Sequence, residues 1–531
     1  MNNADLLVAL LTRAGIRRGF GVPSGNVLPL IEAMRVGGID FVLTAHEGSA
    51  AFAADVTARV SGTPGLCIAT LGPGATNLTT GVGCAYLDRT PLIAITCNLN
   101  QAQLGRRIQM WIDHAALFKP IVKASFRLRA GSIVETVSEA LRMARSEPHG
   151  PVHLDLPEDV ALAAATEQLP DDIAPAPAAD AVDLRAAAAL LRRAQRPFAV
   201  IGASAMRMRD PALLRAFVER HRIPYATTTM AKGLIDEDHP LSIGCIERAA
   251  RQVQRRFVRE RADLVIGLGY DTIEVEYEAW VGNVPVLHVD IERADVDASV
   301  RLEAEVVAPL DASVRALAAL APARHAWTDQ EVSAHRVAFQ AALRPASASF
   351  CPHHAIDVVR RVLPRDGVLA FDVGAHTHQI ASQWTAHSPR TFLITNGWSS
   401  MGFGLPAAIA AKLARPDLPV VCIVGDGCFQ MTCGEVAVAQ RERLAIPFVV
   451  LDDGWLSLIK VKQERRALDL YGTSLDRESR NPPAHYFGVP AAGVESAEAL
   501  ERELTAALAA DGPRVIEARV DAAHYSQTVY D

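Results

Sequence analysis

Short apolar runs alternate with helical segments along most of this chain, and this alternation limits the possible folds more than any other feature. Near the start, for example, the runs Gly65–Thr70 and Pro91–Thr96 follow a helical segment, Gly48–Val60. Runs of this length separated by helices are typical of parallel sheets, because each parallel connection must cross over the sheet. The sequence therefore predicts an α/β fold built on parallel sheets.

The alternation occurs in three blocks that are separated by breaks in the pattern. A stretch rich in Pro, Asp and Ala, Leu169–Val182, follows the first block, and a mostly helical connector from Ala323 to about Phe350 follows the second. The later strand-like runs are Pro197–Ile201, Ala262–Ile266, Pro285–Val289, Gly367–Phe371, Val420–Val424 and Pro447–Leu451. We expect three α/β domains, at residues 1–168, 183–322 and 350–531. The first and third blocks have a similar order of strand-like and helical segments, but their sequences are not similar enough to indicate a repeat.

Charge and composition exclude several classes of protein. The net charge is −7 and the charged residues are interspersed, without a basic tract that would neutralise many phosphates, so we expect no nucleic-acid partner. Neither a signal peptide nor an apolar run of about 18 residues is present, which predicts a cytoplasmic protein without a membrane segment. The eight cysteines form no C-x-x-C pair, so a structural zinc site is not expected, and we interpret Cys428 and Cys433 as reduced thiols.

Two acidic segments follow neighbouring predicted strands in the third block. Gly425-Asp426-Gly427 follows Val420–Val424 and precedes a helical segment that we expect to begin near Thr432. Its glycines allow a backbone to approach a phosphate, and a carboxylate is a suitable ligand for a hard cation, although Asp-Gly is also an ordinary turn. Asp453 ends the next run, 27 residues later. Adjacent strand ends meet at one edge of a parallel sheet, so we predict that the two carboxylates share one ion. The alternative for Asp453 is a turn residue before Gly454.

This pairing resembles the signature of thiamine-diphosphate enzymes, and three further segments support the resemblance. They are Thr44–Ala51 with Ala58-Arg59, Leu71–Leu78 continuing through Ala85–Thr96, and Ser400–Ala408. The second is close to the acetolactate-synthase pattern. The matches occur in the expected order across nearly the whole chain, so the chain is identified as an acetolactate-synthase-like member of this family.

The resemblance implies a role for each matched residue. Glu47 would be catalytic, because it would hydrogen-bond the cofactor's pyrimidine ring and make the cofactor's own amino group a base. The alternative is a carboxylate that only stabilises the first turn of a helix. Met401 would force the cofactor into a bent shape, or else fills a gap in the core. Asp426, Asp453 and the backbone carbonyl of Trp455 would hold Mg²⁺.

The full set of implied cofactor-binding residues is Pro23, Glu47, Gly374, Ala375, His376, Ser399, Met401, Gly425, Asp426, Gly427, Cys428, Asp453, Trp455, Leu456 and Ser457. Candidate substrate contacts are Gly25, Gln109, Leu458 and Lys462. Gln109 lies one position from the commoner pattern of a substrate-channel segment, Ile108–His114.

Three departures from the family pattern bear on substrate and cofactor. Lys462 precedes Gln463 where biosynthetic members have tryptophan; it would bind an anionic acceptor or is an exposed lysine on a helix. Asp453 stands where asparagine is the common ligand. The segment Ile266–Glu274 is closer to flavin-free, catabolic members, and Gly267-x-Gly269 is too short for a dinucleotide fingerprint. We therefore expect thiamine diphosphate and Mg²⁺ as cofactors and no FAD.

The resemblance implies decarboxylation of a small 2-oxo acid such as pyruvate, with transfer of the acyl anion to a second carbonyl. It also implies a homodimer or homotetramer. Two alternatives stay open: a simple 2-oxo-acid decarboxylase that releases an aldehyde, and a non-catalytic paralogue that binds the cofactor and regulates a partner.

Overall fold

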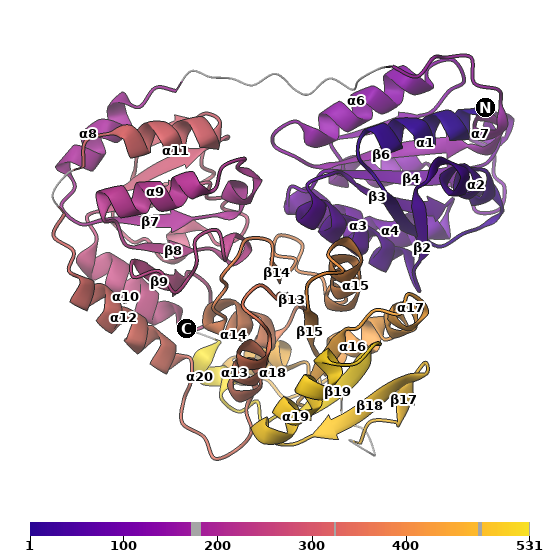
Figure 1. Ribbon diagram of the computed structural model, residues 1–531. Coiled ribbons are helices and arrows are strands. Elements are labelled where there is room, and N and C mark those ends of the chain that lie inside the picture. The colour runs from indigo at the N-terminus through magenta and orange to yellow at the C-terminus, as the bar shows by residue number, and fades with distance from the viewer. Residues whose placement is uncertain (171–181, 323–324, 476–480, 530–531) are drawn as a thin grey trace.

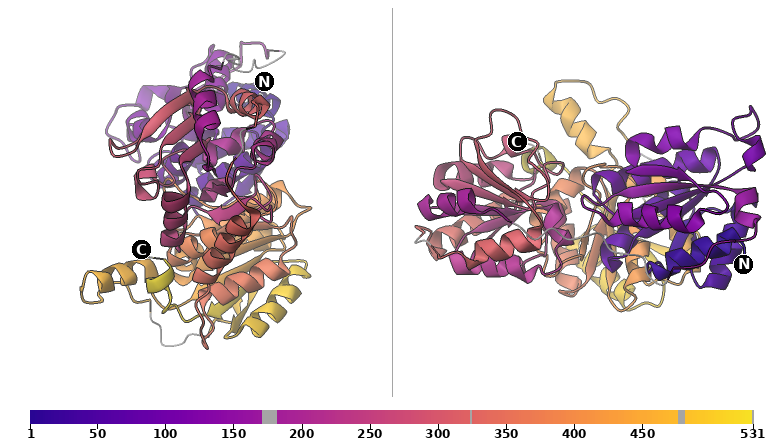
Figure 2. Two further views of the ribbon diagram at one scale, coloured as in Figure 1. Left: turned by 90° about the vertical axis from the view of Figure 1, so that its left-hand side faces the viewer. Right: turned by 90° about the horizontal axis from the view of Figure 1, so that it is seen from above.

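The computed structural model describes residues 1–170, 182–322, 325–475 and 481–529. Three β-sheets, each packed between helices, form three domains, and the third domain lies against both of the others (Figures 1 and 2). Two of the sheets are wholly parallel, and the third has one short antiparallel edge strand. The predicted α/β architecture is therefore confirmed.

The first domain contains a six-stranded sheet of order β2-β1-β3-β4-β6-β5. Its strands are β1 (Arg18–Gly21), β2 (Asp40–Leu43), β3 (Gly65–Thr70), β4 (Leu92–Asn98), β5 (Ala124–Arg127) and β6 (Pro151–Pro157). Its helices are α1 (Asn3–Arg13), α2 (Leu28–Gly37), α3 (Glu47–Ser61), α4 (Pro73–Leu87), α5 (His114–Phe118), α6 (Ile133–Arg145) and α7 (Glu158–Leu162).

The central domain contains a six-stranded sheet of order β12-β11-β10-β7-β8-β9. Its strands are β7 (Pro197–Ile201), β8 (Tyr225–Thr227), β9 (Ser242–Cys245), β10 (Leu264–Leu268), β11 (Val286–Asp290) and β12 (Leu302–Val307). Its helices are α8 (Arg185–Arg193), α9 (Ala212–His221), α10 (Arg251–Arg261) and α11 (Leu310–Ala319), and α12 (Asp329–Ala342) leads to the third domain.

The third domain contains a seven-stranded sheet of order β14-β13-β15-β16-β19-β18-β17. Its strands are β13 (Val368–Phe371), β14 (Phe392–Leu393), β15 (Val420–Gly425), β16 (Pro447–Asp452), β17 (His485–Tyr486), β18 (Val489–Val494) and β19 (Arg514–Arg519). Its helices are α13 (Pro352–Val362), α14 (Ala375–Gln383), α15 (Gly404–Ala414), α16 (Asp426–Thr432), α17 (Glu435–Arg441), α18 (Ser457–Arg465), α19 (Ala497–Leu508) and α20 (Tyr525–Thr528).

One hydrophobic core joins the first and third domains. Helix α15 lies directly beneath α3 and α4 in Figure 1, and the alanine-rich faces of α3 and α15 allow the helices to approach closely. Phe52 and Phe403 meet edge to face at this seam, with ring centroids 5.6 Å apart. The Arg59 guanidinium pairs with Asp55 at 2.6 Å and Asp88 at 2.8 Å, and also donates to the backbone oxygen of Ile394. The seam therefore combines buried apolar side chains with the specific contacts of Arg59.

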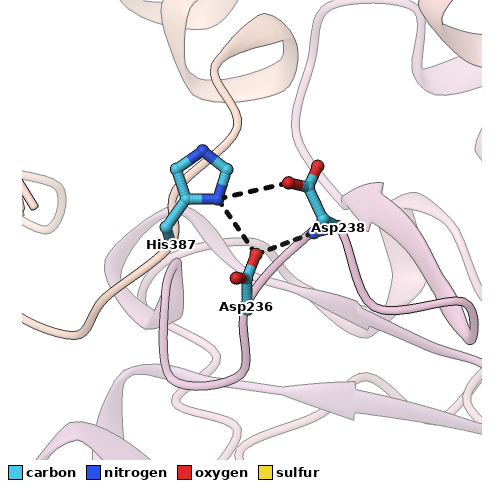
Figure 3. A group of neighbouring side chains, drawn as sticks. All are labelled: Asp236, Asp238 and His387. Carbon is cyan, nitrogen blue, oxygen red and sulfur yellow. Dashed lines mark hydrogen bonds and ion pairs between the residues drawn. The ribbon is translucent and has the colours of Figure 1, made fainter. Parts of the chain in front are cut away.

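A charged cluster joins the central and third domains (Figure 3). Asp236 and Asp238 follow β8, and the Nδ1 atom of His387 in the third domain lies 2.9 Å and 3.6 Å from their carboxylates. Arg365 pairs with each of these carboxylates at 2.8 Å. Because the guanidinium already supplies positive charge to both carboxylates, we interpret this cluster as a joint between domains.

The helix expected near Thr432 begins earlier, at Asp426, so that prediction was wrong by six residues. Asp426 occupies the first helical position, where a carboxylate is favourable, and its Oδ1 accepts the N–H of Gly427. The low helix propensity of the Gly-Asp-Gly segment conceals this start in the sequence. Most of the expected break at Leu169–Val182 lies outside the described residues. Within the described ranges, the helices are too short or too polar to span a membrane.

Candidate cofactor site

A cavity of about 220 Å³ lies at the carboxyl ends of β13, β15 and β16. All the residues that line it belong to the third domain: Val373, Gly374, Ala375, His376, Ser399, Met401, Gly425, Asp426, Gly427, Cys428, Leu451, Asp453, Trp455, Leu456, Ser457, Leu458, Ile459 and Tyr525. This edge is where parallel sheets place their ligands. Every residue of the third domain that was predicted to bind the cofactor lies in this lining.

Asp426 and Asp453 bring two carboxyl groups together at adjacent strand ends. The Asp426 Oδ2 accepts the N–H of Gly454 at 2.9 Å, while Asp453 accepts from the Ser457 hydroxyl at 2.7 Å and from the Trp455 N–H at 3.0 Å. Burial raises the pKa of both groups, and the nearby charge of Asp453 raises that of Asp426 further. A buried carboxyl group, Asp426, and a half-buried one, Asp453, both with raised pKa values, form a suitable site for a divalent cation, which would compensate their charge.

His376 supplies a polar atom that the described residues leave unsatisfied. Its Nε2 is buried and has no hydrogen-bond partner among them, and burial lowers the pKa of the ring to about 4. A Cβ on Gly374 or Gly425 would lie 2.8 Å or 3.0 Å from this ring, so only glycine leaves the space open. The unsatisfied nitrogen and the open space beside it fit an anionic group such as a diphosphate, which would accept a hydrogen bond from His376.

Asp372 holds the loop that carries Met401. Its buried carboxylate accepts the N–H groups of Gly402, at 3.0 Å, and Gly404, at 2.8 Å. The tip of Met401 faces the first turn of α16, since a Cβ on Gly427 would lie 3.3 Å from the Met401 Cε. Sequence reasoning missed Asp372, although an acidic residue directly after β13 was a signal that could have revealed it.

Glu47 lies in the first domain, at the first position of α3. The side-chain amide of Asn77 on α4 donates to its Oε2 at 3.0 Å, and a Cβ on Gly74 would lie 3.3 Å from its Oε1. Just before it, the Ala45 N–H donates to the Glu435 carboxylate of α17 at 3.1 Å, which ties this loop to the third domain. Within one chain, however, Glu47 is not among the residues that line the cavity with Asp426.

Of the remaining predicted residues, Leu458 lies in the lining. The others lie outside the cavity: Pro23, Gly25 and Gln109 are exposed in the first domain, and Lys462 is half-buried on α18. Sequence reasoning did not anticipate Val373, Leu451, Ile459 and Tyr525 as lining residues. Tyr525 comes from α20, far along the chain from the acidic segments, and no local pattern marks it.

Each of the three domains matches a domain of thiamine-pyrophosphate enzymes. Residues 1–117 match the "Thiamine pyrophosphate enzyme, N-terminal TPP binding domain", and residues 372–518 match the corresponding C-terminal TPP binding domain. Residues 184–317 match the central domain of the same enzymes. Thiamine pyrophosphate is another name for thiamine diphosphate, the cofactor that the sequence motifs predict.

Several relatives are similar over most of their length. The acetolactate synthase isozyme 1 large subunit of Escherichia coli K12 is 32% identical, with 87% of this chain and 83% of that protein covered. The acetolactate synthase large subunit of Parasynechococcus marenigrum is 30% identical, covering 98% and 88% respectively. That of Lactococcus lactis is 30% identical, covering 87% and 82%.

Proposed function

The chain belongs to the thiamine-diphosphate-dependent enzymes of the acetolactate-synthase type, and from this membership we propose that it acts on pyruvate. In this proposal pyruvate loses carbon dioxide and its acyl anion is transferred to a second carbonyl compound, with a second pyruvate giving acetolactate. The observation that carries the proposal is the pair Asp426 and Asp453 beside the unsatisfied His376, at the edge where two strands end.

The third domain would hold Mg²⁺ and the cofactor's diphosphate. Asp426, Asp453 and the Trp455 carbonyl would ligate the ion, and His376 with the N–H groups at the start of α14 and α16 would bind the phosphates. When bound, the cofactor supplies the electron sink that lets a 2-oxo acid lose carbon dioxide. Met401 would support the middle of the cofactor, and Leu458 and Ile459 would keep water from the reacting carbon.

Glu47 would hold and move the proton at the pyrimidine nitrogen. Asn77 fixes one carboxylate oxygen, which leaves the other free for that contact. In this role the glutamate needs to reach the same cofactor as Asp426, yet Glu47 is not among the residues that line the cavity of its own chain.

We therefore propose that a second copy of the chain completes each site, as a homodimer or a homotetramer. Apolar side chains are exposed beside both halves of the site, which supports a contact there: Leu28 is 58% exposed near Gly25, and Met431 is 62% exposed near Cys428. Covering such residues is favourable in an interface between subunits.

Products formed from pyruvate test the proposed reaction. The purified protein with Mg²⁺ and thiamine diphosphate should release carbon dioxide and form acetolactate, detected by mass spectrometry. Acetaldehyde without any carboligation product would instead indicate a simple decarboxylase. A protein that binds the cofactor but turns over none of a panel of 2-oxo acids would be a non-catalytic paralogue. Either result would refute the proposal.

A further inference from the structure

The central sheet has a topological switch point between β7 and β10. From β7 the chain adds β8 and β9 on one side and β10, β11 and β12 on the other. Open parallel sheets bind dinucleotides in the crevice between the loops that follow such a pair of strands, with the diphosphate against backbone N–H groups. This is the place in the central domain where a dinucleotide such as FAD would be expected.

In this chain the two loops at the switch point are in direct backbone contact. A Cβ on Gly202, after β7, would lie 2.5 Å from the backbone oxygen of Gly269, after β10. Gly269 has a positive φ of 61°, and a Cβ there would lie 2.5 Å from the Ala205 nitrogen. The Ser204 N–H also donates to the Gly269 oxygen at 3.0 Å. The crevice is closed by main chain, so no rotation of a side chain can open it.

Four hydrogen-bond donors beside this closed crevice converge on one side chain, Glu274. Its Oε2 accepts the Ala203 N–H at 3.0 Å and the Thr228 hydroxyl at 2.5 Å. Its Oε1 accepts the Met230 N–H at 2.8 Å and lies 3.4 Å from the Asn396 amide nitrogen of the third domain. Ala203 begins the short 3-10 turn Ala203–Arg207, which follows β7, and Met230 lies within the 3-10 turn Thr229–Ala231, which follows the adjacent strand β8. We call these four donors the cradle.

We infer that Glu274 is a built-in substitute for a dinucleotide diphosphate, so that the central domain is filled by its own carboxyl group and takes no FAD. The cradle suits a carboxyl group better than a diphosphate, because all four donors are neutral. Burial raises the pKa of Glu274 to about 8, so the group is largely protonated at neutral pH and needs no cation. A diphosphate keeps its charge at this pH and would need one.

The cleft beside the cradle is also unfavourable for an anion. The central domain lines it with seven acidic residues: Asp271, Glu276, Glu278, Asp290, Glu292, Asp295 and Asp297. Three basic residues, Arg89, Lys123 and Arg293, line the same cleft and are outnumbered by the acidic ones. Arg89 is paired with Asp271 and, at 2.7 Å, with Glu292, and the Lys123 ammonium donates to backbone oxygens of the first domain. The negative charge of this cleft therefore disfavours binding of a dinucleotide, as does the presence of Glu274 in the cradle.

Binding of FAD and ADP to the wild-type protein is the first test, and it needs no substrate. Calorimetric titration with either nucleotide should give no binding at millimolar concentration. One FAD or ADP bound per chain would overturn the inference.

The variant Glu274→Ala supplies the complementary test, because it empties the cradle. The variant should have a lower Tm than wild type, and acetate, which replaces the missing carboxyl group, should raise that Tm in a saturable way by a few degrees and by more than inorganic phosphate does. Wild type, Glu274→Gln and the matched control Glu276→Ala, on the exposed side of the same segment, should show no such response. A variant as stable as wild type and indifferent to both anions would refute the role of Glu274.

The variant Thr228→Val tests the same contact if Glu274→Ala does not fold. It removes one donor and keeps the size of the side chain, so the Tm should fall. An unchanged Tm would contradict the inference.

Discussion

The first and third domains share one topology and differ in what their loops carry. The order β2-β1-β3-β4-β6-β5 in the first sheet corresponds strand for strand to β14-β13-β15-β16-β19-β18 in the third. After β3 the first domain has the neutral segment Gly72-Pro73-Gly74, whereas in the third domain β15 ends at Gly425 and Asp426-Gly427 follow directly. The strand β4 ends in Asn98, whereas β16 is followed by Asp453.

This difference shows that topology determines where a ligand lies and the loop residues determine which chemistry is available there. In the third domain two carboxyl groups meet at adjacent strand ends, which suits a metal and a diphosphate. In the first domain those positions are uncharged, and the one carboxylate proposed for catalysis, Glu47, follows β2 instead. Neither domain alone contains both the pair of carboxyl groups suited to a metal and the carboxylate proposed for catalysis.

Removal of the carboxylate in the first domain should have the largest effect. The variant Glu47→Gln should lower kcat by about 10²–10⁴-fold, the range for a general acid–base residue, while the affinity for thiamine diphosphate changes little. Steady-state kinetics and calorimetry would measure the two effects. The matched control Glu32→Gln, on an exposed face of the same domain, should keep full activity. Turnover near wild type in Glu47→Gln would remove Glu47 from the mechanism.

A substitution of Asp453 in the third domain should weaken Mg²⁺ binding rather than proton transfer. Asp453→Ala should raise the Mg²⁺ concentration for half-maximal activity about 10–100-fold, whereas Asp453→Asn should stay active because its amide oxygen can still ligate. The control is Asn98→Ala, at the corresponding strand end of the first domain, which should not change the Mg²⁺ requirement. An alanine variant with an unchanged requirement would show that Asp453 is no ligand.

The seam between these two domains should respond to pH through Glu435. Burial raises the pKa of this carboxyl group to about 7 from its ordinary 4.5. The folded state therefore holds the proton more tightly than the unfolded state, so this contribution to stability is lost as pH rises from about 4.5 to 7.

Glu435→Gln should remove that loss, which we expect to be roughly 1–3 kcal/mol over the window. Chemical unfolding of both proteins at several pH values measures it. Parallel pH profiles of stability for the two proteins would contradict this assignment.

The seam between the central and third domains should be the weaker one, because its ion pairs are exposed. Arg365→Gln should lower the free energy of unfolding by about 1 kcal/mol or less, and by less still at high salt. Urea unfolding at two salt concentrations would measure the change. A loss of several kcal/mol would show that the cluster at Asp236, Asp238 and His387 is more than an exposed joint.

The sequence predicted those parts of the molecule that depend on local patterns. Strand runs such as Gly65–Thr70 and Pro197–Ile201 coincide with β3 and β7, because short apolar runs between helices have few other structures available. The prediction that Asp426 and Asp453 lie close together is confirmed, because both line one cavity at adjacent strand ends.

Contacts between distant segments were not predictable in the same way. Asp372, Tyr525 and Glu274 have roles that depend on tertiary packing, and none lies in a periodic pattern. The early start of α16 was concealed by its glycines, whose low helix propensity is overridden by the tertiary setting.

Activity of a mixed dimer is the most direct test of the central claim, that one chain supplies Glu47 and another supplies Asp426 and Asp453 to each site. Glu47→Gln and Asp426→Ala chains would be purified separately, mixed under conditions that exchange subunits, and assayed with pyruvate. Each mixed dimer then contains one site with both groups intact, so two inactive proteins should regain about a quarter of the wild-type activity. A mixture that exchanges subunits, as shown by mass spectrometry, and yet stays inactive would contradict the account.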